Sequence, residues 1–326
     1  MCQVESAGHV NGNGDVSRRN FLRGTLSCGA YVALALAGAS YSQRRAFAAT
    51  TSGEVVAETK FARVEKIAEG AWAVISTPQG GQFTTVSNGG IIAGRDAVLA
   101  VEGFMNPAGA QWLREVAVSI AGRAPTHVVM THFHNDHIGG VAGYAGDGGM
   151  PRLVVTETVN GRLKKDVAQQ SDMMVVKSDG PTEIDLGGRT VRLVPRKGHT
   201  PSDLSVELVD PKITWCGDLF WNGMFPNYVD AIPSELEANC RALLGDSAAT
   251  YVPGHGAVAK GSDTANYLAL LQDIEATARK AFAAGTPADE VFKTYVPPAS
   301  MGTWEILMPN MHRSAFVAWE KELAKA

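Results

Sequence analysis

The chain has 326 residues, 45% of them hydrophobic, which suits one large domain or two small ones with a substantial core. Its formal net charge is −4. The first 48 residues carry five basic and two acidic side chains, so the remaining chain has a formal charge of −7. That charge disfavours the basic surface that nucleic-acid binding needs, and no nucleic-acid partner is expected.

The first 48 residues are typical of an export signal rather than of a folded domain. Residues 17–22 read Ser-Arg-Arg-Asn-Phe-Leu, which resembles a twin-arginine motif. The apolar stretch 26–39 is shorter than the ~20 residues of a membrane span, and Ala-Phe-Ala at 46–48 fits a cleavage site. We therefore expect a cleaved signal peptide at 1–48, export by the twin-arginine machinery to the bacterial periplasm, and no stable membrane anchor. A basic tail or a retained anchor is the alternative.

The mature chain, 49–326, is expected to form a single domain in which two series of strands are each followed by helices. A flexible start at 49–60 precedes the first series. Its strands are expected at 61–67, 71–76, 82–87, 90–93, 97–101 and 126–130, with a helix over 107–120. The second series has strands at 152–156, 190–194, 204–209, 212–216 and 250–252, and helices at 157–170, 234–244, 262–284, 287–294 and 312–325. Such an order favours an α/β fold of two packed halves.

A dense group of metal-ligand residues follows the strand at 126–130. His132, His134, Asp136 and His137 lie within six residues, and Gly139-Gly140 follow. Imidazole suits zinc, and carboxylate oxygen is also accepted. A loop after a strand's C-terminal end, where open α/β sheets place their sites, can aim several side chains at one point.

Three further residues of ligand type follow downstream. His199, Asp218 and His255 each come after a strand-like run and beside Gly or Pro, as expected for turns after strands. Any one alone would be read as a solvated loop residue. The cluster at 132–137 and these three later residues, in this order, together predict a two-metal site.

The motif His-x-His-x-Asp-His, with the later His, Asp and His, resembles the metallo-β-lactamase superfamily of metallohydrolases over about residues 61–260. The resemblance implies a four-layer αβ/βα sandwich with two Zn²⁺ at one edge of its sheets, although iron or manganese are possible. Diiron relatives carry Glu at the position of His134, which favours zinc. By this resemblance, one zinc is held by His132, His134 and His199, the second by Asp136, His137 and His255, and Asp218 bridges both.

The resemblance also implies a hydrolytic mechanism, in which a metal-bridging hydroxide attacks a carbonyl or phosphoryl centre. We expect Asp136 to be catalytic, because a ligand facing that hydroxide can orient it and pass a proton to the leaving group. The alternative is that Asp136 is a ligand only. Asp203 is interpreted either as a support for His199 or as a surface residue, and Thr200 as a turn cap.

Two segments are expected to contact a small-molecule substrate. Residues 77–82 are expected to form a mobile hairpin tip between two strands, close to the site. The run after Asp218 carries Trp221, Phe225 and Tyr228, which are expected to line the cleft, with core packing as the alternative. Cys216 and Cys240 remain after the leader is removed, and for Cys216 we favour a buried free thiol over a disulfide or a metal ligand.

The predicted function is that of an exported dinuclear zinc hydrolase acting on a small ester, lactone, thioester or amide. A metallo-β-lactamase acting on β-lactam antibiotics is one alternative. Asp218 and Trp221 disfavour it, because zinc β-lactamases of the Cys-ligand subclass carry Cys and Lys there. A mononuclear iron persulfide dioxygenase or sulfur-metabolism metalloprotein is the second, and a non-catalytic periplasmic binding protein is the third.

Overall fold

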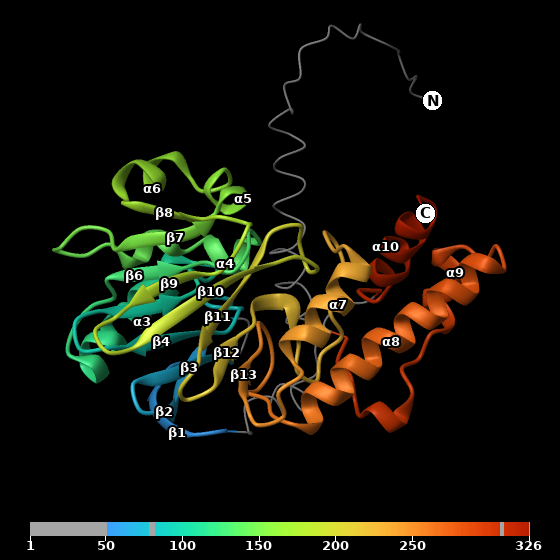
Figure 1. The fold of residues 1–326 in the computed structure, drawn as a ribbon, viewed down its shortest axis with the longest axis horizontal. Helices are drawn as coiled ribbons and strands as arrows, with labels where there is room; N and C mark the ends of the chain where they lie inside the picture. The colour runs from blue at the N-terminus through green and yellow to red at the C-terminus, as the bar shows by residue number, and fades with distance from the viewer. Residues whose placement is uncertain (1–50, 78–81, 307–309, 326) are drawn as a thin grey trace, which may run out of the picture.

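The computed structural model describes residues 51–77, 82–306 and 310–325. Two β-sheets face each other, and helices cover the outer side of each (Figure 1). The predicted signal peptide lies outside the described residues, as does most of the predicted hairpin tip at 77–82. Within the described ranges, no helix combines the length and apolar character needed to cross a membrane.

The larger sheet contains eight strands in chain order. They are β1 (Glu54–Glu58), β2 (Ala62–Ala68), β3 (Ala71–Ser76), β4 (Gly89–Ala93), β5 (Val98–Val101), β6 (His127–Val129), β7 (Arg152–Thr156) and β8 (Met173–Val176). Neighbours are antiparallel from β1 to β5 and parallel from β5 to β8.

Strand β5 shows why these sequences form a central strand. Its four residues, Val98 to Val101, are apolar and buried. Because successive side chains of a strand point to opposite faces, Val98 and Ala100 pack under the outer helices, while Leu99 and Val101 pack between the sheets. A strand covered on both faces is expected to be apolar throughout rather than alternating.

The smaller sheet has the strand order β13-β12-β11-β10-β9. Its strands are β9 (Thr182–Asp185), β10 (Thr190–Arg196), β11 (Asp203–Leu208), β12 (Ile213–Trp215) and β13 (Thr250–Val252). All pairs are antiparallel except β12 with β13. Inward residues such as Leu193, Val206 and Trp215 meet those of the larger sheet in one shared core.

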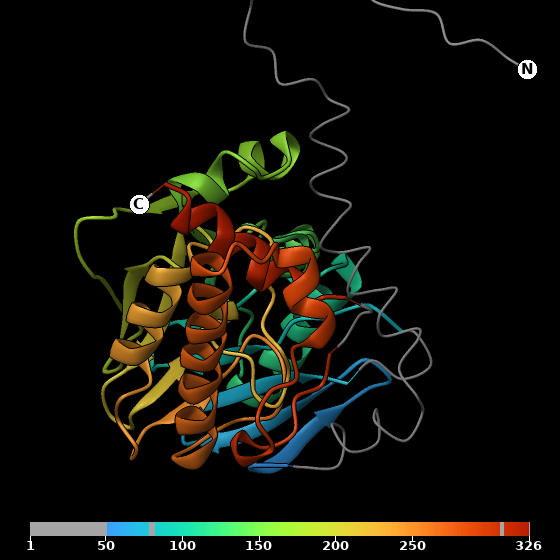
Figure 2. The same ribbon diagram turned by 90° about the vertical axis from the view of Figure 1, so that its right-hand side faces the viewer.

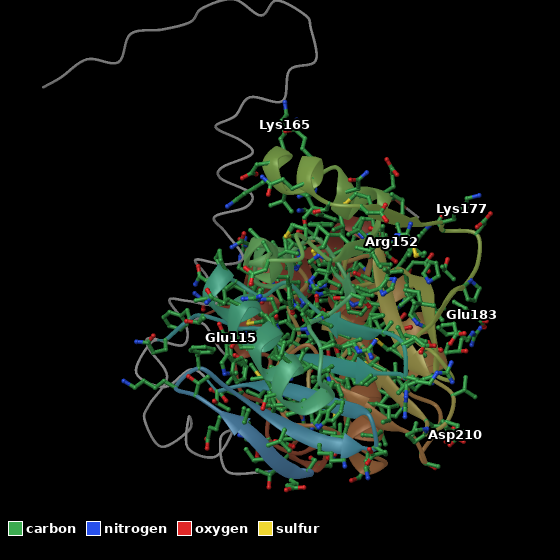
Figure 3. All side chains as sticks on the ribbon, turned by 90° about the vertical axis from the view of Figure 1, so that its left-hand side faces the viewer. Glu115, Arg152, Lys165, Lys177, Glu183 and Asp210 are labelled. Carbon is green, nitrogen blue, oxygen red and sulfur yellow. The ribbon has the colours of Figure 1, made fainter. Side chains whose placement is uncertain are left out.

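Helices form the two outer layers. On the larger sheet these are α3 (Pro107–Ala121), α5 (Glu157–Asn160) and α6 (Lys165–Gln170), with short α4 (Asn135–Ile138) and η1 (Val141–Tyr144) at one edge. Figure 3 shows α3, which carries Glu115, lying across that sheet. On the smaller sheet they are α7 (Pro233–Leu243), α8 (Ser262–Ala283), α9 (Ala288–Thr294) and α10 (Arg313–Leu323), with η2 (Gly217–Leu219) and η3 (Ala299–Met301) as short turns. Figure 2 shows α7, α8 and α10 side by side.

The four-layer αβ/βα sandwich is confirmed, and four local predictions need correction. Residues 82–87 form no strand. Val86 has a φ of 68°, which interrupts an extended backbone, and the side chains beside it are held elsewhere: Thr85 Oγ1 donates to Phe61 O at 3.0 Å and Ser87 Oγ to Asp136 O at 2.6 Å. The stretch 49–60 contains β1 rather than only a flexible start. The strands β8 and β9 were not expected, and the helix predicted at 157–170 is divided into α5 and α6.

Candidate metal centre

The predicted ligand residues converge from both sheets at one edge of the sandwich. His132 and His134 come from the segment that joins β6 to α4, and Asp136 and His137 lie in α4 itself. The other three residues each follow the C-terminal end of a strand in the smaller sheet: His199 after β10, Asp218 after β12 and His255 after β13. The ends of strands that belong to both sheets therefore meet at a single point.

Two groups of ligand atoms can be distinguished there, and within each the atoms lie within 4.8 Å of one another: His132, His134, His199 and Asp218 form the first, and Asp136, His137 and His255 the second. In the first group, His134 Nδ1 lies 3.0 Å from His132 Nε2 and 2.9 Å from His199 Nε2. In the second, Asp136 Oδ2 lies 3.4 Å from His255 Nε2. All seven side chains are buried.

Asp218 stands between the two groups. Its Oδ2 lies 3.3 Å from His199 Nε2, and its Oδ1 lies 3.1 Å from His137 Nε2 and 3.3 Å from His255 Nε2. One carboxylate oxygen therefore faces each group. This is the arrangement that a residue bridging two cations requires.

The residues fit a pair of metal ions. His137 Nε2, His255 Nε2 and Asp218 Oδ1 are buried and have no hydrogen-bond partner among the residues that the structure describes. Leaving such atoms unpaired is costly, since a buried polar group is ordinarily satisfied. Nitrogen and carboxylate donors that converge in this way are those of zinc, iron or manganese sites. The chain thus holds the metal-binding His/Asp clusters typical of its fold.

Neutral acceptors and one exposed carboxylate orient the histidines of the first group. His199 Nδ1 lies 3.1 Å from Asn227 O, and His132 Nδ1 lies 3.0 Å from Thr131 Oγ1. His134 Nε2 lies 2.9 Å from Asp230 Oδ2. Each contact occupies one ring nitrogen and turns the other toward the cluster. Asp230 was missed from the sequence, because no motif marks an aspartate in an exposed loop.

A buried glutamate supports the second group. Glu102 Oε1 lies 3.0 Å from His137 Nδ1, which leaves His137 Nε2 facing the metal position. Thr131 donates to the same carboxylate from its backbone N at 3.2 Å and its Oγ1 at 2.6 Å. Glu102 has a φ of 78°, a left-handed conformation that is unfavourable for a non-glycine residue. Its position directly after the apolar strand β5 is the one sequence signal that could have identified it.

The two groups hold protons differently. Burial, followed by the charge of neighbouring histidines, lowers the pKa of His132 well below its ordinary value. Burial likewise lowers the pKa of His199 to about 3. Burial also acts on His255, but there Asp218 and Asp136 outweigh it and raise the pKa to about 9. In the metal-free site, His132 and His199 are therefore neutral near pH 7, whereas His255 holds a proton.

Close backbone approaches fix Asp218 in place. A Cβ atom at Gly254 would overlap Asp218 Oδ1, and one at Gly217 would lie 2.6 Å from Thr131 Oγ1. Gly217 also has a φ of 53°, which favours glycine. The glycines beside Asp218 and His255 therefore make room for the ligands as well as turning the chain.

The turn after His199 is braced by a buried aspartate. Asp203 accepts hydrogen bonds from Thr200 N at 3.0 Å and from Thr200 Oγ1 at 2.6 Å. Burial raises the pKa of Asp203 to about 7, against the opposing effect of these bonds. Asp203 is thus a support of the His199 turn rather than a surface residue, and Thr200 caps that turn through Ser202 N at 3.1 Å.

Of the three aromatic residues predicted to line the cleft, the structure brings one against the ligands. Trp221 stacks on His255, with ring centroids 4.0 Å apart. Phe225 instead contacts Tyr295 and His312, and Tyr228 lies in the same core under the C-terminal helices. Phe225 and Tyr228 therefore have packing roles here, because the apolar helices draw their rings away from the site. Substrate contact by Trp221 stays a prediction.

Cys216 and Cys240, the two cysteines within the described ranges, are both buried and free. Cys240 Sγ lies 2.9 Å from Leu219 O, and Cys216 Sγ lies 3.6 Å from Thr214 O. Burial raises the pKa of both thiols, so they stay protonated. The preference for a buried free thiol at Cys216 is confirmed.

Comparisons with known proteins agree with this geometry. The chain is 29% identical over 189 residues to a hydroxyacylglutathione hydrolase of Acidiphilium cryptum, which covers 56% of this chain and 73% of that protein. Among solved structures, it resembles metallo-β-lactamases from Pontibacter korlensis (TM-score 0.54, 20% identity, 65% of this chain and 99% of that one) and Hirschia baltica (TM-score 0.51, 20% identity, 65% and 98%). Residues 87–255, which contain every predicted ligand, match the family model of the metallo-beta-lactamase superfamily. That match spans more than half of the chain and agrees with its fold, so the protein belongs to the metallo-β-lactamase superfamily.

Proposed function

We propose that this protein is an exported dinuclear zinc hydrolase of small acyl compounds, thioesters first among them. The observation that carries the proposal is the position of Asp218, which directs one oxygen to each of two complete ligand groups. The relative from Acidiphilium cryptum, named as a hydroxyacylglutathione hydrolase, supports thioesters as the first substrates to test.

Two divalent ions bound here would lower the pKa of water from about 15.7 to about 7 and polarise a scissile carbonyl. The chain's own residues supply orientation and proton transfer. Asp136 is buried, and its Oδ2 lies 3.6 Å from His137 Nε2 and 3.4 Å from His255 Nε2. From that position its carboxylate can accept a proton from the attacking water and return it to the leaving group.

The environment of Asp136 keeps its carboxyl ionised. Burial raises the pKa of this carboxyl, but His137 and His255 outweigh that effect and lower it overall. Asp136 is therefore a carboxylate near neutral pH, the form that can bind a metal ion. Its backbone is held by Ser87 Oγ, which donates to Asp136 O at 2.6 Å.

The test is thioester hydrolysis by the purified, zinc-loaded protein, with a chelated sample as the control. We expect release of thiol that stops with chelation and returns with zinc, with kcat/KM above the ~10⁴ M⁻¹s⁻¹ typical of enzymes on their own substrates. A chromogenic cephalosporin is assayed in parallel. Hydrolysis of the cephalosporin alone would replace the thioesterase proposal with a β-lactamase function.

Metal analysis separates the proposal from a persulfide dioxygenase. Two zinc ions per chain are expected, because the second ligand group is as complete as the first. A single iron without zinc, with oxygen consumption on a persulfide, would contradict the proposal.

Export is tested separately. Replacement of both Arg18 and Arg19 by Lys should retain the full-length precursor in the cytoplasm, because the proposed transporter recognises the arginine pair. Periplasmic recovery of that double variant at the wild-type level would contradict twin-arginine export.

A further inference from the structure

An arginine lies against the metal-binding loop from outside. Arg162 stands in the link between α5 and α6, and its guanidinium carbon lies 3.9 Å from the centre of the Phe133 ring. Phe133 sits between two ligands in the sequence, and its ring centroid is 5.1 Å from that of His134. Two ring contacts thus connect the guanidinium to the first metal group.

A second exposed side chain lies beside His134. Asp230 Oδ2 lies 2.9 Å from His134 Nε2. Arg162, whose guanidinium stacks on Phe133, approaches the same histidine. Arg162 and Asp230 are both exposed, whereas the metal ligands beside them are buried.

The Arg162 guanidinium makes a ring contact but no ion pair or hydrogen bond with another residue that the structure describes. Arg279 offers a contrast, since it lies 5.2 Å from the Trp319 ring centre but is paired with Glu275 at 2.7 Å. Among the described residues, Arg162 is thus a stacked cation whose hydrogen-bond donors are not engaged.

This geometry suits the recognition of a carboxylate. A guanidinium that rests its face on an aromatic ring keeps its in-plane N–H groups available, and their fork matches the two oxygens of a carboxylate. The mature chain has a formal charge of −7, so its overall field does not attract anions. A local cation beside the metals is then what an anionic substrate needs.

We propose that Arg162 binds a carboxylate group of the substrate, so that the enzyme prefers anionic acyl compounds to neutral ones of the same shape. This inference rests on the proposed hydrolase function and narrows its substrate class. Stacking on Phe133 would hold the guanidinium at a fixed distance from the scissile bond and position the acyl group over the metals.

The test compares S-acetyl-3-mercaptopropionate with S-acetyl-3-mercaptopropionamide, which differ only in carboxylate against carboxamide. The wild-type, zinc-loaded protein should favour the carboxylate. The ratio of the two kcat/KM values should fall about tenfold in Arg162→Gln, as expected for loss of one charge-assisted pair. Arg162→Lys should keep part of the preference. Arg279→Gln is the matched control, an arginine over an aromatic ring in the outer helices, and should leave the ratio unchanged.

A binding measurement keeps the inference testable without turnover. By calorimetry, succinate should bind the zinc-loaded wild-type protein more tightly than succinamate, its monoamide, which keeps one carboxylate for the metals, and Arg162→Gln should remove most of that difference. An unchanged ratio and an unchanged binding difference in Arg162→Gln would overturn the role of Arg162 and leave the hydrolase proposal standing. Absence of thioester turnover in the wild-type protein would count against the hydrolase proposal, while the calorimetry would still decide the role of Arg162.

Discussion

The two metal groups are built from the same kinds of side chain but differ in protonation. His199 in the first group has a pKa of about 3, whereas His255 in the second has one of about 9. Both rings are buried, so burial alone does not separate them. The difference comes from their neighbours: His255 faces two carboxylates, those of Asp136 and Asp218. His199 faces only that of Asp218 and lies beside His134 and a backbone carbonyl.

This contrast shows that one metal centre can combine a ligand group that has a neutral histidine with a ligand group that has a protonated histidine. Only a neutral imidazole binds a metal, so the first group can accept an ion directly. In the second group the ion must displace protons. We therefore expect the first site to fill at lower metal concentration and at lower pH than the second.

The largest expected effect is that of removing the bridge between the groups. Asp218→Ala should lose both metal ions and lower kcat/KM more than about a thousandfold, because each group loses a charged oxygen. Metal content by mass spectrometry and thioester turnover measure it. Retention of two metals would contradict the bridging role.

A glycine variant tests the same bridge without changing a ligand. Gly254→Ala should displace the Asp218 carboxylate, because the added methyl group would occupy the position of Oδ1. We expect a loss of metal close to that of Asp218→Ala. Gly148→Ala is the control, since no atom lies within 4 Å of the Cβ that it would add and its metal content should not change.

Metal content as a function of pH separates the two groups directly. A group with a raised pKa holds its proton up to a higher pH, so the proton on His255 competes with metal below about pH 9, and competes more strongly the lower the pH. His199, with a pKa of about 3, offers no such competition above pH 4. Dialysis against limiting zinc at pH 8 and at pH 5 should leave about two ions and about one ion per chain, respectively. Simultaneous loss of both ions would contradict the contrast.

Glu102→Gln should weaken the second site more than the first, because Glu102 contacts His137 directly and reaches His132 only through Thr131. The carboxylate beside His137 Nδ1 fixes the ring and increases its basicity, and loss of such a partner typically costs 10–100-fold in metal affinity. Competition with a chromogenic chelator measures both steps of binding. A fall in the affinity of the first step, with the second unchanged, would reverse the assignment of Glu102.

Asp230→Asn should have the smallest effect, confined to the first site. The Asp230 side chain is 46% exposed, so water weakens its contact with His134. We expect roughly a tenfold loss of affinity in the first step, at the low end for such partners. Asp172→Asn, which alters an exposed carboxylate paired with Arg152, is the control and should not affect either step.

The fold was predictable to the extent that apolar runs and turn residues marked its elements. The strands β3, β4 and β5 and the helix α3 were predicted nearly to the residue, because their buried positions follow the expected periods. The strands β8 and β9 were missed, since they lie at the ends of the two sheets, where few side chains are buried. The predicted strand at 82–87 was wrong, because contacts to Phe61 and Asp136 override its local pattern.

The ligand positions were predictable because metal chemistry restricts residue type and spacing. Their supports were not. Glu102 is 35 residues from its partner His137 in the sequence, and Asp230 contacts a histidine 96 residues away. Such contacts depend on how loops fold back over the site. The same holds for Phe225 and Tyr228, whose rings are directed by helices that come later in the chain.

The origin of the ligands in two sheets has a mechanical consequence. Four of them follow β6 in the larger sheet, and three follow strands of the smaller one, so bound ions would act as a cross-link at the open edge of the sandwich. Ligands that bind only the folded state stabilise it by RT ln(1 + [L]/Kd), about 4.1 kcal/mol at a thousand times Kd. Metal depletion would then reduce the stability of the protein against proteolysis as well as its activity. A sandwich that opens at this edge would expose the β6 and β12 segments to proteases.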